Sequence, residues 1–161
     1  MTESPAADRG MSVIVKTVAR WLWTPILVYG IYTVLYGHLS PGGGFAGGVM
    51  IATGLTLRTL AYGEPRTAQE ASRARAAVLE SAGALLFLVA AFAGLLTAGT
   101  FFLNVLPTPV ARQFTLLSGG LIPVYNVGIA LKVAGGLFVA FSALALMQRI
   151  FMPGGDGTEG T

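Results

Sequence analysis

The chain has 161 residues, of which 54% are hydrophobic and 11% are charged, and its formal net charge is +3. Soluble domains carry about 25% charged residues, so this composition excludes an ordinary water-soluble domain and indicates a protein surrounded by lipid. The sequence has no cysteine and a single histidine, His38, which excludes disulfides, thiolate metal sites and multi-histidine metal sites.

Several partners and cofactors are excluded on similar grounds. No cluster of lysine and arginine carries interleaved aromatic residues, so nucleic acid is not an expected partner. Nothing in the sequence suits a flavin, a haem or an iron–sulfur cluster, so no cofactor is expected. The remaining signal lies in four apolar segments, at 18–36, 44–62, 76–98 and 122–147.

Each of these segments is long enough to cross a membrane. A hydrocarbon core of ~30 Å requires about 20 residues at 1.5 Å per residue, and helix is expected because an isolated span has to satisfy its own backbone. The expected fold is therefore an all-α integral membrane protein with four transmembrane helices. We expect one membrane domain over 12–152, with disordered polar tails at 1–11 and 153–161.

The basic residues predict the direction of the four spans. One side of the membrane would receive both tails and the connection between the second and third spans, whereas Arg112 alone falls on the other side. Because basic residues concentrate in cytoplasmic segments, both termini are expected in the cytoplasm, with the protein in the cytoplasmic (inner) cell membrane. The residues on the basic side are Arg9, Lys16, Arg20, Arg66, Arg73, Arg75 and Arg149.

The first connection and the start of the second span, GHLSPGGGFAGGVM at 37–50, contain the pattern G-x-G-x-x-G. A dinucleotide-binding turn requires a preceding strand within a βαβ unit, and a membrane span precedes this one, so no nucleotide is expected. Small residues recurring every four positions instead predict a tight turn followed by close helix packing. The glycines concerned are Gly42, Gly43, Gly44, Gly47 and Gly48, with Gly119 and Gly120 before the fourth span.

An ion-binding function of the same connection is the alternative. His38 and Ser40 lie beside backbone that glycine leaves bare, and together these groups could line a polar pocket for an ion. An imidazole changes charge within the physiological pH range, so His38 could also collect external protons. The simpler interpretation is that His38 hydrogen-bonds the turn.

Two opposite charges lie near the inner ends of the second and third spans. Arg58 is four residues before one end and Glu80 four residues after the other, so both lie ~6 Å below the same boundary. Because a short connection joins the two spans, we predict an Arg58–Glu80 ion pair. The alternative is that each side chain reaches the headgroup layer separately.

Lys132 lies about 15 Å into the fourth span, close to the midplane of the membrane. No acidic residue is expected at that depth, so Lys132 is either neutral at times or paired with a charge on another subunit. It could serve a proton or cation relay, or act as a fixed ionic anchor to a partner helix. Tyr125 and Asn126, nearer the outer boundary, could contribute polar contacts to the same path.

The sequence HLSPGGGFAGG at 38–48 resembles the signature of the MnhB-type subunit of multisubunit cation/proton antiporters of the Mrp or Mnh type. SGGLIPVYNVG at 118–128 is similar to a second block of that family, and the likeness covers roughly 12–147. The resemblance implies a transporter subunit without catalytic residues of its own, which works with other membrane subunits in exchanging Na⁺ for H⁺. The large subunits of such complexes resemble the proton-pumping subunits of respiratory complex I.

Two other functions are open at this point. A related domain occurs in the membrane arms of energy-converting hydrogenases, so the chain could be a non-conducting scaffold of a redox-driven pump. It could also be a small homo-oligomeric carrier, but such carriers resemble one another in having an acid deep in the first helix, and 18–36 has none. Four helices are also few for a complete transporter, which usually requires paired repeats.

Overall fold

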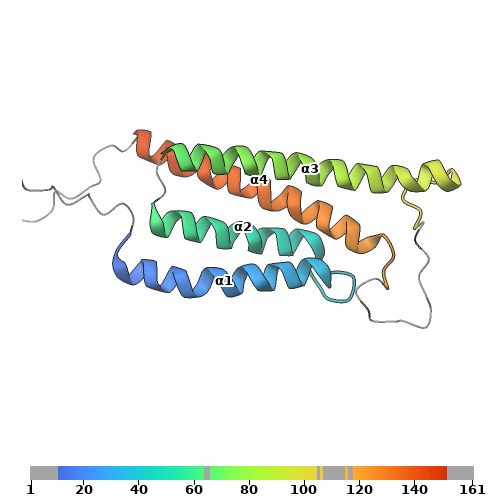
Figure 1. Ribbon diagram of the computed structural model, residues 1–161, viewed down its shortest axis with the longest axis horizontal. Helices are drawn as coiled ribbons and strands as arrows, with labels where there is room; N and C mark the ends of the chain where they lie inside the picture. Colours follow the sequence, from blue (N-terminus) through green and yellow to red (C-terminus); the bar gives the residue numbers. More distant parts are fainter. Residues whose placement is uncertain (1–10, 64–65, 105, 107–114, 116–117, 152–161) are drawn as a thin grey trace, which may run out of the picture.

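The computed structural model describes residues 11–63, 66–104, 106, 115 and 118–151 (Figure 1). It contains the helices α1 (Val13–Leu35), α2 (Gly43–Tyr62), α3 (Arg66–Ala98) and α4 (Ile122–Phe151). All four are long and apolar enough to cross a membrane, which confirms the predicted all-α membrane fold. The expected tails lie outside the described residues except for Met11, and the cytoplasmic assignment of the termini stays a prediction.

Helix α3 begins well before the apolar segment from which it was predicted. It has 33 residues, which corresponds to about 50 Å of helix. Its first turns are rich in alanine, arginine and glutamate, which are strong helix formers, so the helix continues through polar sequence. Glu80 consequently lies about 21 Å from the start of the helix rather than close to it.

The four helices form two hairpins that meet along α4. Helix α1 packs along α2, α3 packs along α4, and α2 also contacts α4. Within the described residues, α3 makes no close backbone contact with α2, although it follows α2 in the sequence. Figure 1 shows this order, with the start of α1 and the end of α4 at the same end of the bundle.

Small residues fill the contacts between the helices. A Cβ added at Gly47 would lie 2.7 Å from the backbone oxygen of Gly30, where α2 meets α1. A Cβ added at Gly48 would lie 2.9 Å from the backbone oxygen of Ala130, where α2 meets α4. Neighbouring glycines of one helix therefore serve two different interfaces, and each lets the backbones touch as small residues do in membranes.

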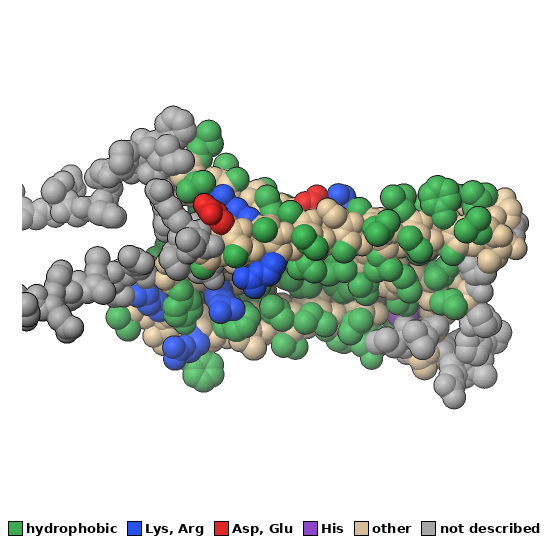
Figure 2. All heavy atoms as spheres, turned by 45° about the horizontal axis from the view of Figure 1, so that its top comes forward, with side chains coloured by type: hydrophobic (Ala, Val, Ile, Leu, Met, Phe, Trp, Pro, Cys, Tyr) green, Lys and Arg blue, Asp and Glu red, His purple; other side chains and the backbone are tan. Residues whose placement is uncertain are grey.

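The large apolar side chains mostly point outward. Figure 2 shows them covering the length of the bundle, while most of the lysine and arginine side chains lie toward one end of it. Lipid is as apolar as these side chains, so packing of small residues rather than burial of large ones holds such a bundle together. The buried hydrophobic residues are Ala19, Val34, Ala52, Ala61, Ala76, Ala90, Ala91, Ala130 and Phe138.

Candidate functional site

Two glycine-rich segments that are far apart in the sequence meet at one end of the bundle. They are the turn between α1 and α2, residues 37–44, and the segment that leads into α4, residues 118–126; we call their meeting point the glycine junction. The turn relies on Gly42 and Gly43, whose φ angles of 124° and 60° suit glycine and strain other residues. These two glycines keep the path from one helix to the next short.

Asn126 joins the two segments of the glycine junction. Its Oδ1 accepts a hydrogen bond of 3.2 Å from the backbone N–H of Gly44. The two backbones are so close that a Cβ added at Gly44 would overlap the backbone of Asn126. The Nδ2 atom of Asn126 is buried and has no hydrogen-bond partner among the described residues.

The side chain of His38 reaches from the α1–α2 turn to the segment that leads into α4. Its Nε2 lies 3.1 Å from the backbone oxygen of Thr115 and 3.3 Å from the Oγ of Ser118. A carbonyl only accepts, so Nε2 carries the hydrogen and Nδ1 is the acceptor in the neutral ring. Nδ1 is buried and has no hydrogen-bond partner within the described part of the chain, and the ring packs against Gly119.

Ser40 and Tyr125 were expected to contribute polar groups here, but both side chains point away from the glycine junction. The Oγ of Ser40 donates a hydrogen bond of 3.0 Å to the backbone oxygen of Tyr36, so it closes the end of α1 instead of facing His38. The hydroxyl of Tyr125 donates a hydrogen bond of 3.2 Å to the backbone oxygen of Ala90 in α3. Neither side chain joins the unpartnered atoms of His38 and Asn126.

Asn104 is a junction residue that the sequence reasoning missed. Its Oδ1 accepts a hydrogen bond of 3.0 Å from the backbone N–H of Leu121. Its side chain packs against Gly120, whose φ of 62° turns the chain into α4. An isolated asparagine in a loop of apolar residues was the available signal, since such a side chain tends to bond nearby backbone.

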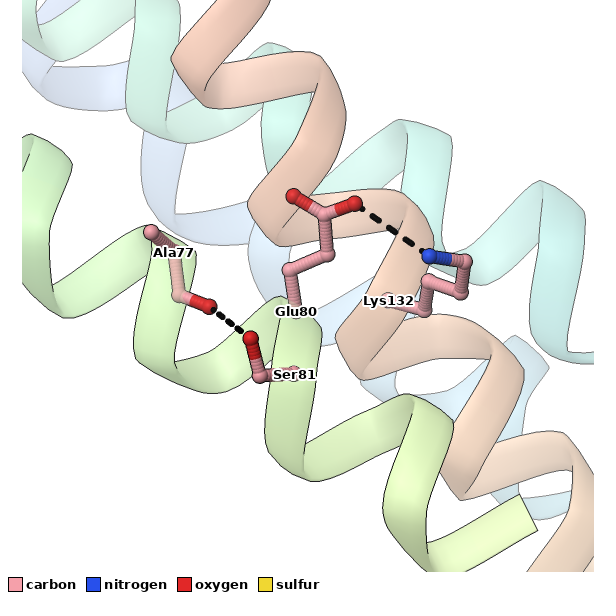
Figure 3. Close-up of polar contacts among 4 residues, drawn as sticks. All are labelled: Ala77, Glu80, Ser81 and Lys132. Atoms are coloured by element: carbon pink, nitrogen blue, oxygen red, sulfur yellow. Dashed lines mark hydrogen bonds and ion pairs between the residues drawn. The ribbon is translucent and has the colours of Figure 1, made fainter. Parts of the chain in front are cut away.

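An ion pair between Glu80 of α3 and Lys132 of α4 is the second polar feature. The Nζ of Lys132 donates to the Oε1 of Glu80 at 3.2 Å, and the two side chains point toward each other (Figure 3). The lysine side chain is 55% exposed and the glutamate side chain 36% exposed. The pair therefore lies on the outside of the α3–α4 hairpin, within two segments that are apolar enough to span a membrane.

The predicted Arg58–Glu80 ion pair is wrong. The guanidinium of Arg58 instead lies 5.2 Å from the ring centroid of Trp23, which is a cation–π contact between α2 and α1. The prediction assumed that α2 and α3 are neighbours because a short connection joins them. Helix α4 packs against both of them, and so the carboxylate of Glu80 meets a residue of α4.

Lys132 was expected either to be neutral at times or to pair with a charge on another subunit, and the second alternative is wrong because Glu80 of the same chain pairs with it. Glu80 was expected near a membrane boundary, whereas α3 extends back to Arg66 and brings Glu80 deeper along the bundle. Helices α3 and α4 run antiparallel, and a Cβ added at Gly83 would lie 2.6 Å from the backbone nitrogen of Lys132. Gly83 therefore lies opposite Lys132, and Glu80 lies about one helical turn before Gly83 along α3. The flexible side chain of Lys132 spans that distance along the bundle.

Comparison with known proteins identifies the family. Residues 14–139 match the family described as the domain related to the MnhB subunit of Na⁺/H⁺ antiporters. An uncharacterized protein of Methanocaldococcus jannaschii is 33% identical over 145 residues, which are 85% of this chain and 53% of that protein. The B subunit of the Na⁺/H⁺ antiporter of Alkalihalophilus pseudofirmus is 32% identical over 89 residues, which are 55% of this chain and 61% of that protein.

A solved structure has the same fold. A chain of the membrane-bound sulfane sulfur reductase, an archaeal respiratory membrane complex, superposes with a TM-score of 0.62 at 29% identity, over 88% of this chain and 60% of that one. This chain thus spans between half and two thirds of the length of these relatives. The predicted family is confirmed: the chain belongs to the family of domains related to the MnhB subunit of Na⁺/H⁺ antiporters.

Proposed function

We propose that this chain is a membrane subunit of a multisubunit complex that exchanges Na⁺, or another monovalent cation, for protons. Membership of the antiporter-subunit family over most of the chain is the observation that carries the proposal. The subunit lies in the cytoplasmic membrane with both termini in the cytoplasm, because the basic residues favour that side. It has no catalytic residues of its own and packs against larger partner subunits.

The Glu80–Lys132 pair is the proposed contact with a partner subunit. Charged side chains in direct contact with hydrocarbon are costly, and such groups usually face a protein interior or a water-filled path. Both side chains are more than a third exposed on this chain alone, so a neighbouring helix with a polar or charged side chain would cover them. The pair then anchors the α3–α4 hairpin to that helix.

A relay role of the same pair is the sharper alternative. The ammonium of Lys132 and the carboxylate of Glu80 are in hydrogen-bond contact, so a proton can pass from one to the other without any intervening group. An anchor requires only that a positive and a negative side chain stay in contact. A relay also requires the carboxylate on α3 and the ammonium on α4, so exchanging their positions distinguishes the two roles.

The glycine junction is the proposed polar entrance, at the end of the bundle opposite the start of α1 and the end of α4. Nδ1 of His38 and Nδ2 of Asn126 are both buried without a hydrogen-bond partner among the described residues. Buried polar atoms are nearly always satisfied in proteins, so water, an ion or a partner subunit would complete them. An acceptor and a donor at the same junction suit a water that carries protons better than a bare cation, which would require oxygen ligands.

The deciding experiment is expression of the gene together with the neighbouring genes in a host that lacks its own sodium/proton antiporters. Everted vesicles should show Na⁺-induced collapse of the proton gradient only when this chain is present and co-purifies with the other subunits. Lys132→Ala should abolish both assembly and exchange if the pair is an anchor, and exchange alone if it is a relay. Full assembly and full exchange with Lys132→Ala would contradict both roles.

A charge swap gives the matched control. Glu80→Lys combined with Lys132→Glu keeps the two charges in contact but exchanges their positions. We expect the swapped variant to assemble under the anchor role and to recover exchange as well. Recovery of assembly without exchange would instead identify the relay.

A non-conducting scaffold in a redox-driven membrane complex is the second candidate function. The likeness to a chain of an archaeal respiratory membrane complex favours it. In that case, the chain should co-purify with redox subunits, and Lys132→Ala should weaken assembly without any separate effect on ion exchange.

A further inference from the structure

A cleft of about 480 Å³ lies between the α1–α2 hairpin and α3, with α4 as its floor. Side chains from all four helices line it. Its volume is in the range of 300–1,000 Å³ that is usual for sites of small ligands. Neither the glycine junction nor the Glu80–Lys132 pair contributes to its walls.

The polar side chains of this cleft are gathered at one end. Arg58 and Thr59 of α2 and Ser72 and Arg75 of α3 line that end, which is the end of the bundle where the described chain starts and finishes. The other lining residues are apolar, among them Phe138. The cleft is therefore apolar along most of its length and cationic at its mouth.

The charge at the mouth has no compensating acid among the residues that line the cleft. Neither Glu70 nor Glu80 lines it, and the carboxylate of Glu80 is engaged by Lys132. Neither Arg58 nor Arg75 has an ion pair with any described residue. Arg75 donates its Nε to the backbone oxygen of Ala71 at 3.2 Å, which leaves its two terminal nitrogens available.

The position of the mouth matches the headgroup layer of a membrane. Arg58 is four residues before the end of α2 at Tyr62, or about 6 Å below it. From the mouth, the lining continues along α4 from Phe138 to Val127, a distance of about 17 Å at 1.5 Å per residue. The apolar part of the cleft thus runs through the depth at which acyl chains lie.

From this charge, shape and depth, we infer that the cleft binds one anionic phospholipid of the surrounding membrane. The phosphate lies between Arg58 and Arg75, with the hydroxyl of Ser72 as a further donor, and an acyl chain lies along α4 toward Val127. Arginine is suited to this role because its planar fork binds phosphate oxygens bidentately. The lipid ties α3 to α2, the two consecutive helices that have no close backbone contact among the described residues.

The experiment uses the full-length chain reconstituted with phosphatidylglycerol in an excess of phosphatidylcholine. After extraction in mild detergent, native mass spectrometry counts the lipids that stay bound. We expect one phosphatidylglycerol per chain, and about tenfold less retained lipid in the R58Q/R75Q variant, because charge-assisted hydrogen bonds are about twice as strong as neutral ones. The K16Q/R20Q variant removes two positive charges from α1 outside the cleft and should retain the lipid.

A second variant tests the apolar part of the cleft. Ala134→Phe fills the space beside α4 while leaving both arginines in place, and it should also lose the lipid. A wild-type chain that holds no phospholipid, or holds phosphatidylcholine equally well, would overturn the inference. So would equal losses in R58Q/R75Q and K16Q/R20Q, or a co-purified protein helix that occupies the cleft in place of lipid. These results would leave the proposed antiporter role untouched, because the inference requires only that the chain spans a membrane.

Discussion

The contact between α3 and α4 at Gly83 should be intolerant of a single added methyl group. A Cβ at this position would lie 2.6 Å from the backbone oxygen of Gly128 and 2.6 Å from the backbone nitrogen of Lys132. Both atoms belong to helix backbone, so neither can rotate out of the way as a side chain would. Gly83→Ala therefore has to separate the two helices.

The size of this effect follows from the distances. Ordinary van der Waals contact begins at about 3.4 Å, so the helices have to move apart by about 0.8 Å, and interiors are too densely packed to absorb such a shift freely. Overpacking of this kind costs about 1–3 kcal/mol. Replacing glycine by alanine within a helix returns about 0.5–1 kcal/mol, so the expected net loss of stability is about 0–2.5 kcal/mol.

Gly136→Ala is the matched control for this prediction. Gly136 lies in α4 and also faces α3, but a Cβ there would be 3.4 Å from its nearest neighbour, the carboxyl carbon of Glu80. The gain in helix propensity is the same in both variants, so their difference in unfolding free energy isolates the overpacking. That difference should be about 1–3 kcal/mol.

The assay can use a pair of introduced cysteines, because the chain has none of its own. Dyes attached at Val78 in α3 and Leu144 in α4, both exposed positions, report the separation of the two helices by energy transfer during titration of micelles with a denaturing detergent. Gly83→Ala should lower the midpoint of this transition relative to Gly136→Ala. Equal midpoints for the two variants would refute the claim that α3 and α4 meet backbone to backbone.

Three further predictions concern single contacts. Asn126→Ala removes the acceptor for the Gly44 N–H and should lower the unfolding free energy by about 1–3 kcal/mol, since a buried donor is left without a partner; an unchanged value in the same titration would count against it. His38→Gln keeps a donor toward the backbone oxygen of Thr115 and should preserve stability, whereas His38→Ala removes that donor and should lower the unfolding free energy by about 0.5–1.5 kcal/mol; equal midpoints for the two variants in the same titration would contradict this. Trp23→Leu removes the aromatic face under Arg58 and should cost about 0.5–1 kcal/mol in the detergent titration, with Trp21→Leu, an exposed neighbour on the same helix, as the control.

The existence and type of the helices could be predicted because hydropathy acts over about 20 residues. The neighbours of each helix could not, since small residues at Gly44, Gly47 and Gly48 indicate that a face packs closely without saying against which helix. In the structure, Gly47 meets α1, while Gly44 and Gly48 meet α4. That choice depends on the arrangement of all four helices at once.

The same limit explains the outcome for the charged residues. Sequence distance suggested that Arg58 and Glu80 would pair, and depth counted from apolar boundaries suggested that Lys132 would find no acid in its own chain. The first prediction assumed that consecutive helices are neighbours, whereas α4 packs against both α2 and α3. The second counted depth from the end of the apolar segment, whereas α3 continues as helix back to Arg66.

Helix α4 links the two polar features of the bundle. Asn126 and Lys132 are six residues apart, about 9 Å along the axis, and they contact α2 and α3 respectively. The interfaces around them bring backbone against backbone at Gly44, Gly48 and Gly83. A movement of α4 imposed on Lys132 by a neighbouring subunit would therefore have to be matched at Asn126, because a helix transmits axial shifts as a rigid element.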